Sequence, residues 1–274
     1  MNNNDTWTRF RPASLWLGPR LSFVEVLCLN SFVKHGMRPI LYCYEDVANI
    51  PVGVEVRNGN EILSSERRFV NLERNSPAPF SDVFRYHLLK KTNLYWVDTD
   101  VYALKPFEFK NDCIYALDIP IINNAVLGLP KDAEALRYLL DWTAQPNINH
   151  PYIKRNALTA LRPHAAADGS LPIERLPYKA LGPLALTRAL QMTALDTAAL
   201  PVETFYPLRP RHVYRSFRNV FGNFDLSRSL CIHLTTGQIY ARARSDDGLS
   251  LTPDTFLGGL LKQDGVDPKA YPII

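Results

Sequence analysis

Two short runs of uninterrupted apolar residues most constrain what this 274-residue chain can fold into. They are residues 39–44 (PILYCY) and 94–97 (LYWV), and each follows a segment with a helical pattern. Strands that read as continuous apolar runs are typical of parallel sheets covered on both faces. The alternation of helix and strand in the first half therefore predicts an α/β fold with a doubly wound sheet.

Helix-capping patterns support this alternation. Ser22 with Glu25 three residues later forms a capping-box pattern and predicts a helix that runs to Lys34. Ser81 is expected to cap a second helix that leads into the apolar run at 94–97. The other expected strands are 13–17, 52–56, 114–117, 121–129 and 229–234, and the other expected helices are 131–144, 183–194 and 252–262.

Composition excludes several classes of protein. The net charge of +4 is too small to indicate nucleic-acid binding, which usually needs a clustered basic face. Four widely spaced cysteines without a CxxC pair lie among apolar residues, which predicts reduced, buried thiols and a cytoplasmic location. No signal-peptide pattern and no apolar run of about 20 residues is present, so we expect no membrane span.

The most informative segment is Asp98-Thr99-Asp100, directly after the apolar run at 94–97. Ligands of open α/β sheets bind beyond the carboxyl ends of the strands. Two carboxylates at such a place are costly unless a cation joins them, and oxygen ligands suit Mg²⁺ or Mn²⁺, which in turn bind substrate phosphates. The alternative is a purely structural role, in which the three residues form an ordinary turn after a strand, where Asp and Thr are common.

The segment around this motif, SDVFRYHLLKKTNLYWVDTDVYALKPF at 81–107, resembles the DXD-motif sugar transferases of bacteria. The family pattern is a Ser-Asp-x-x-Arg-Tyr helix, an apolar strand ending in Asp-x-Asp, and a proline shortly after. It is carried here by Ser81, Asp82, Arg85, Tyr86, Asp98, Asp100 and Pro106. One departure is Thr92-Asn93, where the family usually has a pair of glycines.

Weaker parts of the resemblance lie on both sides of this segment. Leu17-Gly18, after the first expected strand, resembles the strand end that meets the nucleotide base. Asn123-Asn124 resembles the family's next strand, whose Asn faces the sugar. Gly182-Pro183, followed by Thr187, resembles a segment near the acceptor, and His233 resembles a late histidine that completes the metal or diphosphate shell.

The resemblance implies a GT-A fold: a Rossmann-like mixed sheet flanked by helices, with an irregular C-terminal half covering the active site. It implies one domain over 1–274, with residues 13–135 binding the nucleotide sugar and residues 136–274 on the acceptor side. Asp100 would bind Mn²⁺ or Mg²⁺ directly, and Asp98 would reach the metal through water or bind the ribose. Thr99, which lies between them, is expected to bind substrate, and Asp82 and Arg85 would hold the donor sugar or brace the DXD loop. Other expected substrate-binding residues are Leu17, Gly18, Ser81, Asp82, Arg85, Tyr86, Gly182, Pro183 and Arg215, and His233 is a further expected metal ligand.

Two of these residues also have a purely structural interpretation. Arg85 could form an i,i+3 ion pair with Asp82 on a solvated helix face. His233 could be a core histidine of a strand.

The expected reaction moves a sugar from a nucleotide diphosphate sugar, of the UDP type, to a saccharide or glycolipid acceptor of the cell surface. The resemblance implies retention of configuration. A double displacement would need a nucleophile such as Asn123, Asn124 or Asp118, whereas a front-face mechanism, in which the leaving phosphate accepts the proton, needs none.

Residues 209–218 (RPRHVYRSFR), which include Arg215, are the most basic stretch of the chain. They could grip a diphosphate or touch the cytoplasmic face of the inner membrane, or they could form a solvated loop.

Two rival functions remain. One is a phosphatase of the haloacid dehalogenase type, with Asp98 as nucleophile and Asp100 as acid/base; its later acidic pair would have to be Asp246-Asp247. The other is a non-catalytic protein that binds nucleotide sugars.

Overall fold

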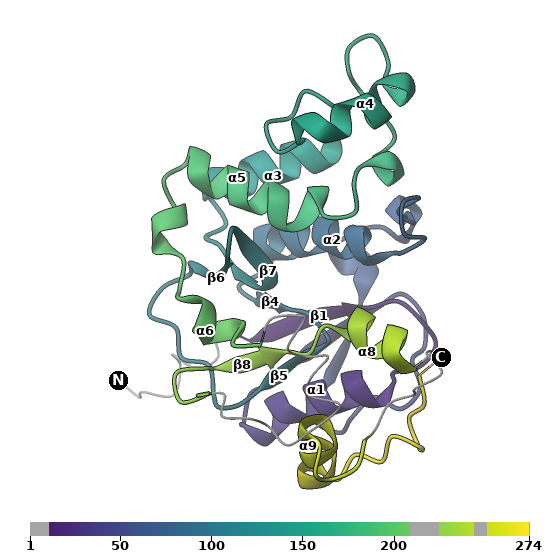
Figure 1. Ribbon diagram of the computed structural model, residues 1–274, viewed down its shortest axis with the longest axis vertical. Coiled ribbons are helices and arrows are strands. Elements are labelled where there is room, and N and C mark those ends of the chain that lie inside the picture. Colours follow the sequence, from purple (N-terminus) through teal and green to yellow (C-terminus); the bar gives the residue numbers. More distant parts are fainter. Residues whose placement is uncertain (1–10, 209–224, 244–250, 274) are drawn as a thin grey trace. The chain divides into compact units, whose positions relative to one another are not determined.

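The computed structural model describes residues 11–208, 225–243 and 251–273 (Figure 1). The chain has the expected α/β architecture, with a mixed six-stranded sheet in the strand order β3-β2-β1-β4-β7-β6. It divides into two compact units, and the boundary runs through β4 (Tyr95–Val97). The described part of unit 1 consists of Asn58–Trp96 and Phe109–Leu200, and unit 2 of Arg11–Arg57, Val97–Glu108 and the chain from Pro201.

Unit 2 begins with a strand-helix-strand segment. β1 (Pro12–Trp16) and β2 (Ile40–Cys43) pair in parallel, and α1 (Phe23–Lys34) connects them. The predicted capping box is present, because the Ser22 side chain accepts a bond from Val24 and Glu25 accepts one from the Ser22 backbone. β3 (Glu55–Asn58) follows, three residues later than the strand predicted at 52–56.

A second, two-stranded sheet in unit 2 was not predicted. β5 (Val101–Ala103) pairs antiparallel with β8 (Cys231–His233), and Val101 lies opposite His233. The core of the unit is an apolar cluster from α1, β5, β8 and α9 (Phe256–Asp264). α6 (Val202–Phe205) precedes β8 and α8 (Thr236–Ala243) follows it.

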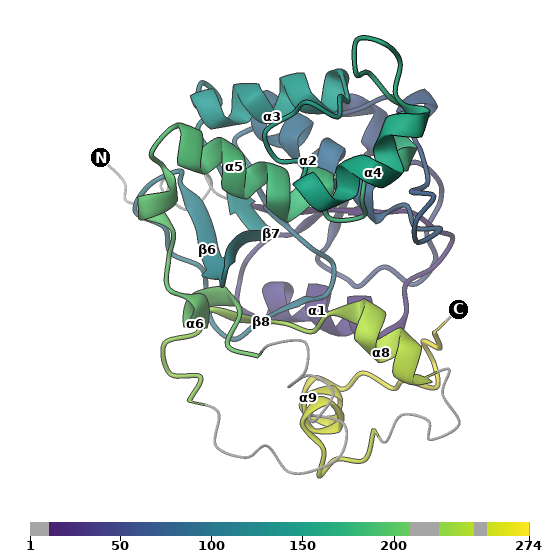
Figure 2. The same ribbon diagram turned by 45° about the horizontal axis from the view of Figure 1, so that its top comes forward.

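Unit 1 packs helices on a β-hairpin. β6 (Ile114–Asp118) and β7 (Ile121–Gly128) pair antiparallel. Figure 2 shows α2 (Ala78–Lys91), α3 (Glu134–Ala144) and α5 (Ala185–Met192) together above this hairpin. The proline-rich segment between α3 and α5 holds 3-10 turns and the short helix α4 (Leu158–Leu161).

The prediction that Ser81 caps α2 is wrong. The helix begins earlier, with Pro77 at the N-cap, and proline is well suited to a first turn because its missing N–H has no partner there anyway. Ser81 therefore lies inside the helix, where its hydroxyl donates to the Ala78 carbonyl at 2.6 Å.

Three cysteines are buried and Cys113 is partly exposed, and all four are free thiols. Among the described residues, no helix combines the length and apolar character needed to cross a membrane.

Candidate functional site

Asp98, Thr99 and Asp100 form a tight turn at the carboxyl end of β4, in unit 2. The Val101 amide donates to the Asp98 carbonyl at 3.1 Å, which closes the turn across three residues. The Ser14 hydroxyl donates to the Val97 carbonyl at 2.6 Å and so fixes the residue before the turn. All three residues of the turn are partly exposed, so their side chains are accessible at the end of a buried strand.

His233 reaches this turn because β8 pairs with β5, the strand that leaves it. The Leu234 amide donates to the Asp100 carbonyl at 2.9 Å, which extends the pairing beyond Val101 and His233. Nε2 of His233 lies 3.2 Å from Oδ1 of Asp100. The chain pairing therefore brings together the aspartates and the late histidine named from the sequence.

The second oxygen of Asp100 is held from α8. Both the backbone N–H and the hydroxyl of Thr236 donate to Oδ2, at 2.7 and 2.8 Å. Tyr240, one turn further along α8, donates to Glu25 at 2.8 Å and contacts the Ser22 hydroxyl at 3.1 Å. These bonds fix α8 and thereby the orientation of the Asp100 carboxylate, with Oδ1 facing His233.

Asp100 is ionised over the whole range of neutral and mildly acidic pH. Burial alone would raise the pKa of this carboxyl, but the charge of His233 and the hydrogen bonds from His233 and Thr236 outweigh it. Together they hold the pKa of Asp100 well below its usual range. The two Thr236 hydrogen bonds do not need the His233 charge, so Asp100 can remain an ionised cation ligand when His233 is neutral and free to bind the same ion.

The donor set fits a divalent ion. One ligand atom each from Asp98, Asp100 and His233 can be chosen so that all lie within 4.8 Å of one another. Two ligands at right angles around an ion with bonds of about 2.1 Å are separated by about 3 Å, close to the spacing of the His233 and Asp100 atoms. Two carboxylates and an imidazole suit ions such as Mn²⁺.

A second cluster of named residues lies in unit 1, around Asp82 and Arg85 of α2. Asp82 and Arg85 form an ion pair at 3.3 Å, and Asn124 of β7 donates to Asp82 at 2.8 Å. The Arg85 guanidinium also donates to the Asn124 carbonyl and lies 4.6 Å above the Trp96 ring. All three polar side chains are buried, with 8% or less of each residue exposed. The expected i,i+3 pair thus exists, but on a buried rather than a solvated helix face.

Gly182 and Tyr86 close this cluster on another side. The Tyr86 hydroxyl donates to the Leu181 carbonyl at 2.7 Å. A Cβ on Gly182 would lie 2.6 and 2.7 Å from the two oxygens of Asp82, so glycine is required for this close approach. Pro183 follows, and its carbonyl accepts a bond from Thr187, whose hydroxyl also accepts the amide of Ile122 in β7.

The remaining named residues lie apart from these clusters. Asn123 points to the opposite side of β7 from Asn124, because side chains alternate along a strand, and it donates to Asp118 at 2.9 Å. Leu17 and Gly18 follow β1 in unit 2 and are partly exposed. Arg215, with the rest of 209–218, and Asp246-Asp247 lie outside the described residues.

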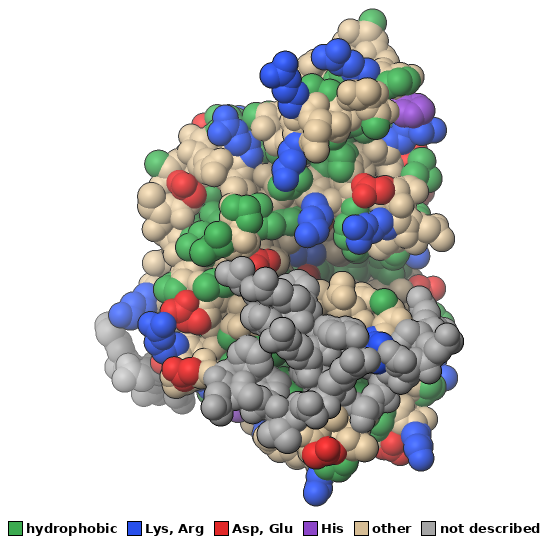
Figure 3. Space-filling model, in the orientation of Figure 1, with side chains coloured by type: hydrophobic (Ala, Val, Ile, Leu, Met, Phe, Trp, Pro, Cys, Tyr) green, Lys and Arg blue, Asp and Glu red, His purple; other side chains and the backbone are tan. Residues whose placement is uncertain are grey.

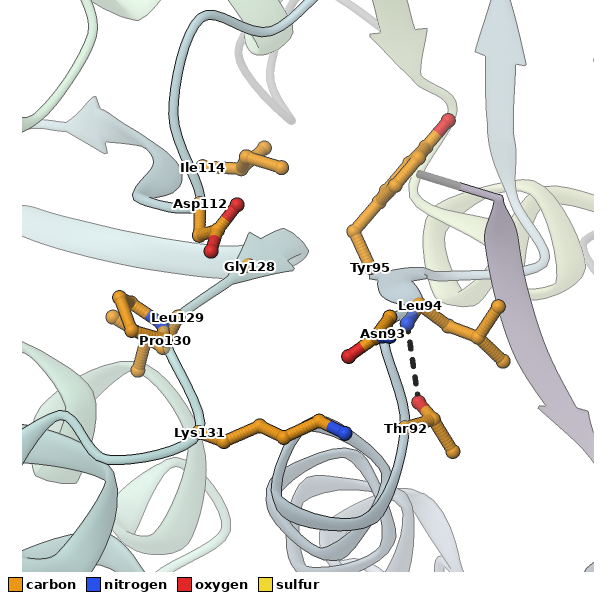
Figure 4. Close-up of a pocket in the computed structure, with 10 residues that line it drawn as sticks. All are labelled: Thr92, Asn93, Leu94, Tyr95, Asp112, Ile114, Gly128, Leu129, Pro130 and Lys131. Atoms are coloured by element: carbon orange, nitrogen blue, oxygen red, sulfur yellow. Dashed lines mark hydrogen bonds between the residues drawn. The ribbon is translucent and has the colours of Figure 1, made fainter. Parts of the chain in front are cut away.

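A small cavity in unit 1 lies away from the named residues (Figure 4). It has about 50 Å³ of space between the start of β4, at Thr92 to Tyr95, and the end of β7, with the Lys131 side chain reaching toward it. This is the amino end of β4, opposite the end that carries Asp98. The cavity can hold water but is too small for a sugar nucleotide, since binding sites for drug-sized ligands have about 300–1,000 Å³.

Sequence reasoning missed Thr236 and Trp96. Thr236 carried a weak signal, since it is the first residue of α8 and the pair Thr235-Thr236 is of the residue type that is common where helices start. Trp96 carried none, because an aromatic residue in a buried strand is normally read as core, and its contact with Arg85 depends on tertiary packing.

Comparison with known proteins gives little help. No family model and no curated protein matches the chain. One similar solved structure is described as "PaToxG Glycosyltransferase"; it is 14% identical, with a TM-score of 0.42, over 66% of this chain and 67% of that one.

Proposed function

We propose that this protein is a metal-dependent glycosyltransferase that takes a sugar from a nucleotide diphosphate sugar, of the UDP type, and moves it to a saccharide or glycolipid acceptor. The observation that carries the proposal is the cluster of Asp98, Asp100 and His233 at the carboxyl end of β4. Ligands of α/β sheets bind at such strand ends. The resemblance of 81–107 to DXD-motif sugar transferases supports the same conclusion. We also propose that residues 1–274 form a single catalytic domain of the GT-A type.

Asp100 and His233 would hold the ion, with Asp98 reaching it directly or through water. When bound, Mn²⁺ or Mg²⁺ supplies Lewis-acid stabilisation of the negative charge on the leaving diphosphate. Thr236 would keep Asp100 oriented through its two hydrogen bonds, so the ligand geometry would not have to form during binding. Leu17 and Gly18, at the carboxyl end of β1, are proposed to contact the nucleotide base.

The buried cluster of Asp82, Arg85 and Asn124 is proposed to bind the donor sugar. A carboxylate accepts hydrogen bonds from sugar hydroxyls and a guanidinium donates to them, so the pair can orient a ring with both kinds of contact. Burial of the ion pair favours this role over a surface salt bridge, because burying charges has a desolvation cost that a stability role alone seldom repays. Ser81, Tyr86, Gly182 and Pro183 are proposed to support the same sugar-binding site.

Transfer with retention is proposed to follow a front-face path, in which the leaving phosphate accepts the proton of the acceptor hydroxyl. Asn123 already bonds to Asp118 and to the Ala125 amide, which leaves it poorly placed to act as a nucleophile. Asn124 is bonded to Asp82.

Thermal-shift measurements with a panel of nucleotide sugars, each with and without Mn²⁺, test the proposal. Binding stabilises the folded state by mass action, so the true donor should raise the melting temperature more than its relatives, and only with the metal. Turnover assays on the best ligand then separate the functions. A transferase releases the nucleoside diphosphate, a phosphatase releases phosphate from simple esters, and a binding protein retains the nucleotide sugar unchanged. Either of the last two outcomes would overturn the proposal.

A further inference from the structure

A convex, basic part of unit 1 has no role in the proposed reaction. The helical run from Arg155 to His164, formed by α4 and the 3-10 turns on either side of it, projects from the rest of the unit (Figures 1 and 2). We call Lys154, Arg155, Arg162 and His164 the basic tip. All four are exposed, and Figure 3 shows Lys and Arg side chains gathered in this region.

The charge of the basic tip is not balanced locally. Residues 154–164 contain two arginines, a lysine and a histidine and no Asp or Glu, although the whole chain has 27 acidic residues. Some other cations of the described chain are paired, such as Arg11 with Glu55 at 2.6 Å and Arg137 with Glu134 at 3.0 Å, whereas single exposed lysines such as Lys110 and Lys269 have no ion pair with a described residue and lie outside any such group of cations. Among the described residues, none of the four members of the tip has a carboxylate partner within ion-pair distance.

The shape of the tip decides which anionic partner it fits. Arg155 and Arg162 lie in the 3-10 turns on either side of α4, and both are exposed. Leu161, at the end of α4, is buried, and the alanines at 165–167 that follow are small. Proteins that hold single-stranded nucleic acid use a groove and aromatic stacking platforms. The run 153–177 has no aromatic residue, and a projecting tip is not a groove. A broad anionic surface is the complementary shape.

We propose that the basic tip docks unit 1 on a lipid bilayer whose surface carries anionic headgroups. Each Lys or Arg near such a surface contributes about 1 kcal/mol to binding, so the three permanent cations together strengthen it on the order of 100-fold. The tip has no large apolar side chain to insert, so the contact is electrostatic and sensitive to salt. This inference does not rest on the proposed enzymatic function, since docking needs neither metal nor nucleotide.

Vesicle co-sedimentation of the full chain tests it. The probes are vesicles of phosphatidylcholine alone and of phosphatidylcholine with about 30% phosphatidylglycerol, at about 0.1 M and about 1 M salt, where the Debye lengths are about 10 and 3 Å. We expect binding to the anionic vesicles at low salt and none to neutral vesicles or at high salt. The triple variant Lys154→Gln, Arg155→Gln, Arg162→Gln should lose on the order of 100-fold in affinity.

The matched control removes the same charge elsewhere, as Lys110→Gln, Lys131→Gln, Lys269→Gln; these side chains are exposed and lie outside the tip. Retained vesicle binding by this control supports the proposal. Equal loss by both triple variants would mean that only net charge matters, and it would overturn the proposal. So would tip-dependent binding to polyuridylate without binding to anionic vesicles. Circular dichroism melting should be unchanged in both variants, because all six side chains are exposed.

Discussion

Nε2 of His233 lies 3.2 Å from Oδ1 of Asp100, although strand β8 and the turn after β4 are far apart in the sequence. The contact exists because β8 pairs with β5, which is the continuation of the turn that carries Asp98 and Asp100. A short antiparallel pair thus brings the candidate metal ligands together, and Thr236 holds the other oxygen of Asp100 from the next helix.

Thr236→Val tests whether this second contact positions the metal ligand. The variant keeps the backbone N–H bond to Asp100 and removes the hydroxyl bond of 2.8 Å. Loss of a partner that orients a ligand typically costs 10- to 100-fold in metal affinity, so we expect roughly a tenfold weaker Mn²⁺ affinity. Electron paramagnetic resonance of free Mn²⁺ during titration measures it. Thr197→Val, at an exposed threonine of unit 1, is the control; equal affinities of Thr236→Val and the wild type would exclude this positioning role.

Gly182→Ala tests the close approach of the backbone to Asp82. The added methyl would lie under 3 Å from both carboxylate oxygens, so the Asp82 side chain has to move from its ion pair with Arg85. Overpacking of this kind typically costs about 1–3 kcal/mol in the free energy of unfolding, and we also expect weaker donor binding.

Gly259→Ala is the control for this substitution, because the nearest atom to its Cβ is 3.5 Å away, in ordinary contact. An alanine inside a helix should be neutral or stabilise by up to about 1 kcal/mol. Chemical denaturation measures both variants, and equal stabilities would show that Asp82 tolerates the methyl.

Tyr152→Phe should stabilise the protein. The Tyr152 hydroxyl is buried and has no hydrogen-bond partner among the described residues, and a buried polar group left unpaired costs about 1–3 kcal/mol. Tyr86→Phe provides the contrast, because it removes the bond to the Leu181 carbonyl and leaves that acceptor unpaired. We expect opposite shifts of melting temperature in the two variants. Destabilisation by Tyr152→Phe would mean that its hydroxyl has a partner, such as a buried water.

His87 should make the fold sensitive to acid. Burial, together with the charges of Arg67 and Lys91, lowers the pKa of His87 to about 4. The unfolded chain has an ordinary histidine pKa of about 6.5, so between these values the unfolded state binds more protons. Stability is therefore retained above about pH 6.5 and falls as the pH drops toward 4. The melting temperature of His87→Gln should fall less than that of the wild type between about pH 7 and pH 5; equal falls would contradict the assignment.

Much of the fold follows from patterns within single segments. The capping box at Ser22 and Glu25 and the apolar runs around β2 and β4 are local signals, and the predicted elements lie within a few residues of the observed ones. The cap predicted at Ser81 is misplaced because α2 begins at two prolines: Pro77 lies at its N-cap and Pro79 in its first turn, where a missing N–H leaves no hydrogen bond unmade. β5 has three residues, too few to show a period.

The candidate site depends on pairing that no single segment contains. Thr236 reaches Asp100 across 136 residues of sequence, and Trp96 supports Arg85 through packing within unit 1. Burial of Asp82 and Arg85 could not be predicted either, because an i,i+3 pair of opposite charges normally indicates a solvated helix face. The family resemblance identified Asp82 and Arg85 as candidate substrate-binding residues. Their buried contacts give the physical reason to propose a sugar site there.

Release of nucleoside diphosphate from the nucleotide sugar that binds best, with and without Mn²⁺, tests the central claim most directly. The wild type should turn over the donor only with the metal, and Asp100→Ala should reduce turnover by at least about 100-fold, because its loss removes several kcal/mol of transition-state stabilisation. Unchanged melting of the variant at neutral pH would exclude simple unfolding. Full activity of Asp100→Ala, or wild-type turnover that is indifferent to the metal, would contradict the proposed function.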